Sequence, residues 1–380
     1  YKDTTKPFVN YWFASSEGNN VETFNKCISD KNQDKLENEG TEFDEKMEDM
    51  TEKIDNVDDK WFRANISKKD LKDLSKKNDL KGLQHVTLYF LLLFFFGYMS
   101  VETWGTWWTV LWLWLYGILF YSSNPIWHEC GHRTAFKSKY LNEIFYQIGS
   151  FMTDFEPTRW TWSHFRHHSN TSSVSDPHDF EAALFHQYPS LKSFLFSFVP
   201  FYELIYFKHS FKFEIIKHAL GITTPVMIDC IPQNEISKCR LISRIHVLLW
   251  ITSFALSFYL MNPLPALLIF FPRYWGNIIN IFNMTQHLGL PEDIKDHRYT
   301  TRSVRFNPIF SFLYWHMEYH VEHHMFPSVP SYNLPKLSKL IKDQLPKANT
   351  SLFDAYKEII PAIIKQHKDN SYYIRKEIAS

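Results

Sequence analysis

Two apolar stretches, almost adjacent in the chain, decide the fold class. Residues 85–101 read HVTLYFLLLFFFGYMSV, residues 104–127 read WGTWWTVLWLWLYGILFYSSNPIW, and only Glu102 and Thr103 separate them. As a helix, each stretch is about long enough to cross a hydrocarbon layer about 30 Å thick. Two such helices with so short a connection must run antiparallel, so the sequence predicts a membrane-spanning helical hairpin.

A second apolar pair, residues 241–261 and 264–283, turns at the Pro-rich segment MNPLP. Neither hairpin turn, 102–103 nor 262–265, contains Lys or Arg, whereas the segments that flank the hairpins are rich in both. Lys and Arg stay on the cytosolic side of a membrane, or on the matrix side in mitochondria. The predicted fold is therefore an all-α membrane protein, with four transmembrane helices in two hairpins and a helical cap on the cytosolic or matrix side.

The remaining sequence gives the domain organisation. It divides into an acidic, polar N-terminal arm (1–60), a membrane domain (61–345) and a C-terminal helical tail (346–380). Within residues 29–60 there are thirteen acidic residues and five lysines, so we expect a solvated segment. Ser67 and Asp70 fit a capping box ahead of a short amphipathic helix. Residues 189–207 are apolar but interrupted by charge and proline, which favours an interfacial helix over a fifth span.

Composition narrows the setting of the protein. Aromatic residues make up 18% of the 380 residues, far more than a soluble core needs, which favours membrane lipids as the surroundings. Lys and Arg number 41 and Asp and Glu also 41, so no bulk charge points to a nucleic-acid partner. The four cysteines form no C-x-x-C pair, and we expect reduced thiols.

One segment, His128-Glu129-Cys130-Gly131-His132, matches the sequence patterns of two kinds of metal site. As H-E-x-x-H it is the pattern of a zinc protease, in which Glu129 would be the general base. As H-x-x-x-H it is two imidazoles on one helix face, which suit any metal that binds nitrogen.

Two further histidine clusters decide between these interpretations. WSHFRHHSN and EYHVEHHMF each contain H-x-x-H-H, a spacing that directs three imidazoles to one face of a helix. Eight candidate ligands result: His128, His132, His164, His167, His168, His320, His323 and His324. A catalytic zinc needs about three protein ligands, so most of these histidines would be left over, whereas a pair of metal ions uses them all. A carboxylate-bridged pair would need two E-x-x-H motifs, and only one is present. Neutral imidazoles with room for oxygen favour non-haem iron.

The order of these clusters around two hairpins resembles the integral-membrane fatty-acid desaturase and hydroxylase superfamily. HECGHRTAF, EPTRWTWSHFRHHSNT, QHLGLPEDIKDHR and YHVEHHMFPSVPSYNLPKL resemble a bacterial-like branch that includes small-metabolite desaturases. The resemblance covers residues 60–345. It implies two irons, O2 as co-substrate, and desaturation or hydroxylation of an acyl chain or amphipathic metabolite.

The same resemblance implies roles for further residues. NMTQH resembles the family's N-x-x-x-H element, which makes His287 a ninth ligand and assigns a metal-bound water to Asn283. Glu129, His316 and Glu322 are expected beside the ligands. A His-Pro-Gly-Gly haem signature is absent from the sequence, so a separate ferredoxin or cytochrome b5 is the expected electron donor. The expected location is a multi-pass position in the endoplasmic reticulum or mitochondrial inner membrane of a eukaryote, or in a bacterial plasma membrane.

Several residues depart from the branch pattern. Arg133 follows the first cluster where a small residue is usual, and His316 and Glu318 stand in place of amides. His316 lies four residues before His320, which predicts a position on the same helix face and a supporting role or an extra ligand. His178 and Asp179 lie in an altered acidic segment. These departures keep open an alternative in which the chain is a structural subunit of a large membrane complex, such as a respiratory one.

Overall fold

The computed structural model describes residues 61–174, 177–181 and 190–378, and the regular structure of these residues is helical. The acidic arm, residues 1–60, lies outside the described residues. The helices, in chain order, are α4 (Lys68–Leu74), α5 (Asp79–Glu102), α6 (Trp107–Tyr121), α7 (Asn124–Gly131), α8 (Lys139–Thr153), α9 (Pro157–Ser169), α11 (Leu191–Phe196), α12 (Tyr202–Ile205), η1 (Phe207–His209), α13 (Phe211–Ala219), α14 (Pro225–Cys230), η2 (Gln233–Glu235), α15 (Ile236–Tyr259), α16 (Leu264–Ile269), α17 (Pro272–Gly276), η3 (Asn277–Ile279), α18 (Asn280–Asn283), α19 (His297–Thr300), α20 (Pro308–Leu313), α21 (His320–Met325), η4 (Ser331–Asn333), α22 (Leu334–Ile341), η5 (Lys342–Gln344) and α23 (Leu352–Lys368).

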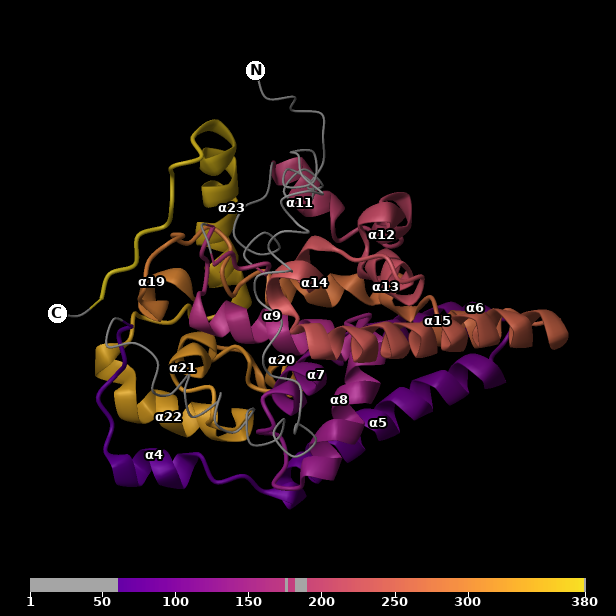
Figure 1. Ribbon diagram of the computed structural model, residues 1–380, viewed down its shortest axis with the longest axis horizontal. Helices are drawn as coiled ribbons and strands as arrows, with labels where there is room; N and C mark the ends of the chain where they lie inside the picture. Colours follow the sequence, from indigo (N-terminus) through magenta and orange to yellow (C-terminus); the bar gives the residue numbers. More distant parts are fainter. Residues whose placement is uncertain (1–60, 175–176, 182–189, 379–380) are drawn as a thin grey trace.

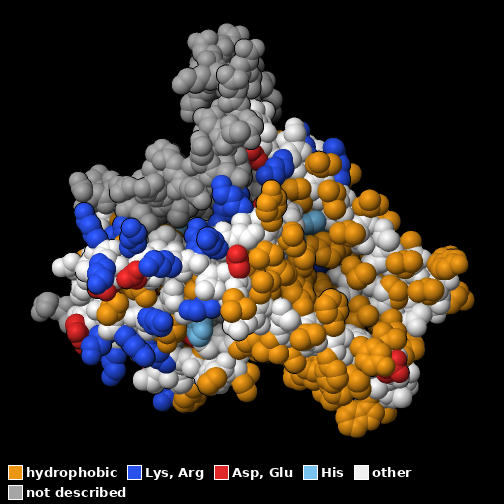
Figure 2. Space-filling view, turned by 90° about the horizontal axis from the view of Figure 1, so that it is seen from below, with side chains coloured by type: hydrophobic (Ala, Val, Ile, Leu, Met, Phe, Trp, Pro, Cys, Tyr) orange, Lys and Arg blue, Asp and Glu red, His pale blue; other side chains and the backbone are white. Residues whose placement is uncertain are grey.

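Two of these helices are long and apolar enough to cross a membrane, namely α5 and the helical stretch Gln233–Tyr259 that contains α15. Only 28% of the apolar part of α5 and 22% of that of Gln233–Tyr259 are buried, whereas the core helices of a soluble protein are mostly buried. Figure 1 shows α5, α6 and α15 extending away from the part of the molecule that contains α19, α21 and α22. Hydrophobic side chains cover that side of the surface, whereas Lys and Arg gather on the other (Figure 2).

The second predicted span is shorter than expected. Helix α6 ends at Tyr121, and a turn at Ser122 and Ser123 leads into the separate helix α7. Helix α6 packs against α17 at a pair of glycines, Gly117 and Gly276. The backbones are so close that a Cβ on Gly276 would collide with the carbonyl oxygen of Gly117. This close approach fixes the position of α7, which follows directly.

The fourth predicted span, residues 264–283, is not one continuous helix. It is divided into α16, α17, η3 and α18, and Pro272 stands at the first break. A proline lacks the N–H that a continuing helix needs, and its ring clashes with the preceding turn. The structure thus has two continuous helices of membrane length among the described residues, and the four-span arrangement stays a prediction.

Three other predicted features are present in the structure, one of them in modified form. Ser67 does cap α4, since its Oγ accepts a hydrogen bond from the Asp70 N–H at 3.0 Å. The predicted interfacial helix at 189–207 is split into α11 and α12, with Pro200 between them. The predicted C-terminal tail is packed on the rest of the protein, because Ile359 and Ile363 of α23 share a buried cluster with Leu288.

Candidate metal centre

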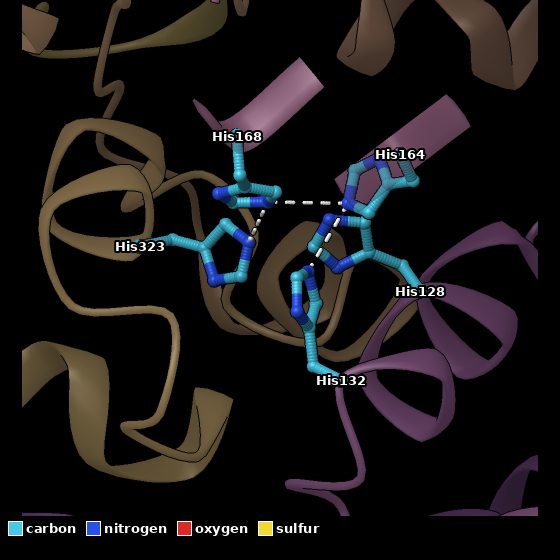
Figure 3. A group of neighbouring side chains, drawn as sticks. All are labelled: His128, His132, His164, His168 and His323. Carbon is cyan, nitrogen blue, oxygen red and sulfur yellow. Dashed lines mark hydrogen bonds between the residues drawn. The ribbon is translucent and has the colours of Figure 1, made fainter. Parts of the chain in front are cut away.

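Nine histidines that are buried or nearly buried form two groups inside the protein. The first group contains His128, His132, His164, His168 and His323, and the second contains His167, His287, His320 and His324. Within each group, each histidine has one ring nitrogen that lies within 4.8 Å of the corresponding nitrogen of every other member. Figure 3 shows the five rings of the first group converging from three separate chain segments. The structure therefore brings all nine predicted ligands together.

Short helices supply eight of the nine side chains. His128 lies in the last turn of α7 and His132 is its C-cap residue. Helix α9 begins with Pro157, and the Glu156 carboxylate caps it by accepting from the N–H groups of Thr158 and Arg159. Its last two turns present the H-x-x-H-H cluster, and α21 presents the third cluster.

His287 comes from a turn between α18 and α19, and buried Arg302 holds this turn. The Arg302 guanidinium donates to the carbonyl oxygens of Thr285 and Leu288, at 2.6 and 3.1 Å. It also pairs with Glu358 of α23 at 2.6 Å. The C-terminal helix thus supports the position of His287, a contact between distant segments that no local pattern predicts.

The spacing of the Nε2 atoms fits metal coordination. His132 and His168 place their Nε2 atoms 3.1 and 3.2 Å from that of His164. His287 and His324 place theirs 3.0 and 3.1 Å from that of His320. Ligand nitrogens about 2.1 Å from one ion lie about 3 Å apart when they subtend a right angle. In addition, both ring nitrogens of His128 are buried without a hydrogen-bond partner in the described part of the chain, a costly arrangement that a metal ion would relieve at one of the two nitrogens.

The opposite ring nitrogens of several ligands are held by hydrogen bonds. His164 Nδ1 lies 3.0 Å from Glu181, and His167 Nδ1 lies 2.8 Å from Asp179. His287 Nδ1 faces the carbonyl oxygen of Thr300 at 2.9 Å. Such partners fix the tautomer and leave Nε2 free for a metal. The supporting roles of Asp179 and Glu181 were not predicted from the sequence, although their place in an acidic segment after the second cluster was a usable signal.

Electrostatics keep most of the ligands neutral. Burial, followed by repulsion from neighbouring imidazoles, lowers the pKa values of His128, His132, His168, His320, His323 and His324 well below the ordinary value. His167 differs: burial works against its charged form, but Asp179 and Glu181 outweigh burial and raise its pKa to about 9. Neutral imidazole is the form that binds metals, so these six histidines are ready to coordinate.

Glu129 and Glu322 make their hydrogen bonds with backbone and hydroxyl groups. Glu129 accepts from the Thr134 hydroxyl at 2.9 Å and from the Ser331 N–H at 3.0 Å. Burial raises the pKa of Glu129 to about 7. Glu322 accepts from the Ser303 hydroxyl at 2.5 Å. Glu129 thus ties α7 to the segment after α21, a contact that does not suit the general base of a zinc protease.

The predicted helical position of His316 is wrong. Helix α21 begins only at His320, and His316 lies before it in a turn with a φ of 60°. Its Nδ1 faces the Ser311 hydroxyl at 2.8 Å, and neither histidine group includes it. The spacing of four residues misled because it implies a shared face only if the helix is continuous.

A cavity of about 30 Å³ lies between the two histidine groups. His128, His164, His167 and His320 line it, together with Asn283 and several aromatic side chains. The Asn283 side-chain oxygen accepts from the Tyr314 hydroxyl at 2.8 Å. The cavity is large enough for about one water or an equally small group.

Arg133 occupies a backbone position that favours glycine. Its φ is 57°, and it directly follows the C-cap residue His132. The Arg133 N–H bonds to the Cys130 carbonyl at 3.0 Å, and the Thr134 N–H bonds to the Glu129 carbonyl at 3.1 Å. This pair of bonds is the Schellman motif, in which glycine is the usual left-handed residue. The motif directs the Arg133 side chain toward a separate pocket that Glu143 and Gln147 also line.

Fold and site together define the class: an all-helical protein with membrane-length helices and two buried histidine groups suited to two metal ions. The family model described as fatty acid desaturase matches residues 102–356, and the chain belongs to this family of oxidoreductases. The chain is also 21% identical over 252 residues to the Delta(5) fatty acid desaturase fat-4 of Caenorhabditis elegans. That match covers 60% of this chain and 56% of the relative, so the chain spans just over half the length of this curated relative.

Proposed function

We propose that this chain is a membrane-bound, non-haem diiron oxygenase that desaturates or hydroxylates a lipid acyl chain or an amphipathic metabolite. The five-histidine group would hold one iron and the four-histidine group the other. The observation that carries the proposal is the convergence of nine imidazoles in two groups with Nε2 separations of 3.0–3.2 Å. The bound irons would supply O2 activation with two externally delivered electrons, which is the chemistry needed to oxidise an unactivated C–H bond.

The residues around the cavity have a positioning task. Trp127, Phe155, Trp160 and Tyr314 line it, and such apolar walls would exclude water and hold an apolar substrate segment against the two groups. Asn283, fixed by Tyr314, is the residue we assign to a metal-bound water.

The proposed membrane topology has four crossings, with α5 and α6 in one hairpin and α15 and the divided segment 264–283 in the other. The histidine groups would then lie on the cytosolic or matrix side, where a soluble or peripheral ferredoxin or cytochrome b5 can deliver electrons. The endoplasmic reticulum membrane, the mitochondrial inner membrane and a bacterial plasma membrane are all compatible with this topology.

Metal analysis of the purified protein tests the proposal. We expect about two irons per chain, and loss of turnover with an electron donor and O2 when His323 or His324 is replaced by alanine. Product analysis by mass spectrometry would distinguish a double bond from a hydroxyl group. A protein that binds no iron, shows no turnover and co-purifies in fixed ratio with other subunits would instead support the structural-subunit alternative.

A further inference from the structure

The surface formed by α4 and α22 carries a concentrated positive charge. Residues 63–81 contain seven cationic and three anionic side chains, and residues 334–347 contain four and one, a net charge of +7. Five lysines of the first segment and four of the second are exposed. Figure 2, which views the molecule from the side of these helices, shows Lys and Arg gathered away from the hydrophobic surface.

These two segments form one rigid surface. The Asn333 side chain donates to the Leu74 carbonyl at 2.7 Å, and Gln344 exchanges two hydrogen bonds with the backbone of Asn65, at 2.6 and 2.9 Å. Leu74 and Leu337 share one buried cluster beneath the lysines. Because the backbone is fixed, the positive charges are held close together, and neighbouring like charges destabilise one another unless an anionic partner is present.

The chain itself supplies a segment of matching charge. Residues 29–60 contain thirteen acidic residues and five lysines, a net charge of −8. This segment joins the described residues at Trp61, two residues before Arg63, the first cation of the surface. Direct covalent attachment gives the segment an effective concentration in the millimolar range at this surface, which no separate partner has.

We propose that the acidic segment 29–60 docks on the basic surface of α4 and α22 in the same chain. Docking would neutralise most of the positive charge. Attraction between exposed charges is screened over about 8 Å at physiological salt, so the docking should weaken as salt is added.

Zero-length cross-linking of the full chain tests this proposal. A carbodiimide couples carboxylates to amines that touch, and mass spectrometry identifies the coupled pairs in protein held in phosphatidylcholine nanodiscs. We expect carboxylates of residues 29–60 to couple to lysines of α4 and α22 at least fivefold more often than to the exposed lysines of α23, Lys357, Lys365 and Lys368. The excess should disappear when the salt is raised to about 1 M, where the Debye length is about 3 Å.

A charge-reversal variant supplies the matched control. Replacement of Lys336, Lys339 and Lys342 by glutamate should reduce coupling to the lysines of α4 at least fivefold. The control variant, with Lys357, Lys365 and Lys368 replaced by glutamate, should leave this coupling unchanged. Equal coupling to α22 and α23 in the wild-type chain, or coupling that is insensitive to salt, would overturn the proposal. Retention of the proposed irons is a separate measurement, so failure of the docking and failure of the proposed function remain distinguishable.

Discussion

The substitution Asp179→Asn tests whether the buried carboxylates control metal binding. Asp179 Oδ2 lies 2.8 Å from His167 Nδ1 and accepts from the Ser172 N–H at 2.8 Å, while Oδ1 accepts from the Glu181 N–H at 2.9 Å. Asparagine has only one acceptor oxygen, so its NH2 group must face at least one N–H donor. It also removes the negative charge that aligns His167.

The expected magnitude follows from these contacts. Loss of a hydrogen bond that orients a metal-bound histidine typically lowers metal affinity about 10- to 100-fold, or about 1.4 to 2.8 kcal/mol. His167 belongs to the four-histidine group only, so that group should release its metal first. The test is a chelator titration followed by metal analysis. At a chelator concentration that leaves about two irons on the wild type, the variant should retain about one, because its weaker group loses metal at a roughly 10- to 100-fold lower chelator concentration.

The matched control is Asp229→Asn. Asp229 of α14 pairs at 2.7 Å with Arg166, which lies on α9, the helix that also carries His167. Asp229 has no hydrogen bond to a histidine among the described residues. This variant should keep both irons. Equal iron retention by Asp179→Asn and the wild type, with helical content unchanged, would refute the assigned role of the carboxylate; so would an equal loss in the Asp229 variant.

Three further outcomes are expected. Arg133→Gly should stabilise the protein by about 1 kcal/mol in thermal unfolding, with its metal content unchanged, because a left-handed residue other than glycine is strained; a destabilised variant would contradict this reasoning. Lys212→Met should destabilise by about 3 kcal/mol because it removes the nearer of the two cations that pair with the buried Asp154 carboxylate and leaves only Arg273, whose Nε lies 3.5 Å away. Lys192→Met at an exposed site should change stability by less than about 0.5 kcal/mol. The metal-free protein should lose stability as the pH rises from 6.5 through 9, because the raised pKa of His167 favours its charged, paired form below that range; a thermal midpoint independent of pH would exclude it.

The two helices of membrane length and eight of the clustered histidines could be predicted from the sequence because each rests on a local pattern; the ninth, His287, was expected only from the resemblance of NMTQH to a family element. The number of consecutive apolar residues sets the length of a helix, and this length can be compared with the thickness of a bilayer without knowledge of the rest of the fold. A spacing of three or four residues places imidazoles on one helix face wherever the helix is continuous. For His128, His164 and His323, this local geometry was enough to name them before their neighbours were known.

The tertiary structure decided what depends on continuity and on distant partners. Pro272 divides the fourth apolar segment, and the turn at His316 removes that residue from the face of His320, although both sequences fit a helix. The division of nine histidines into groups of five and four, with His168 and His323 from different helices in one group, depends on how α7, α9 and α21 pack. Asp179 acts on His167 from twelve residues away, through a loop whose path no periodicity specifies. The sequence by itself thus determined which side chains can bind metal, while only the packing of the helices determined which of them meet.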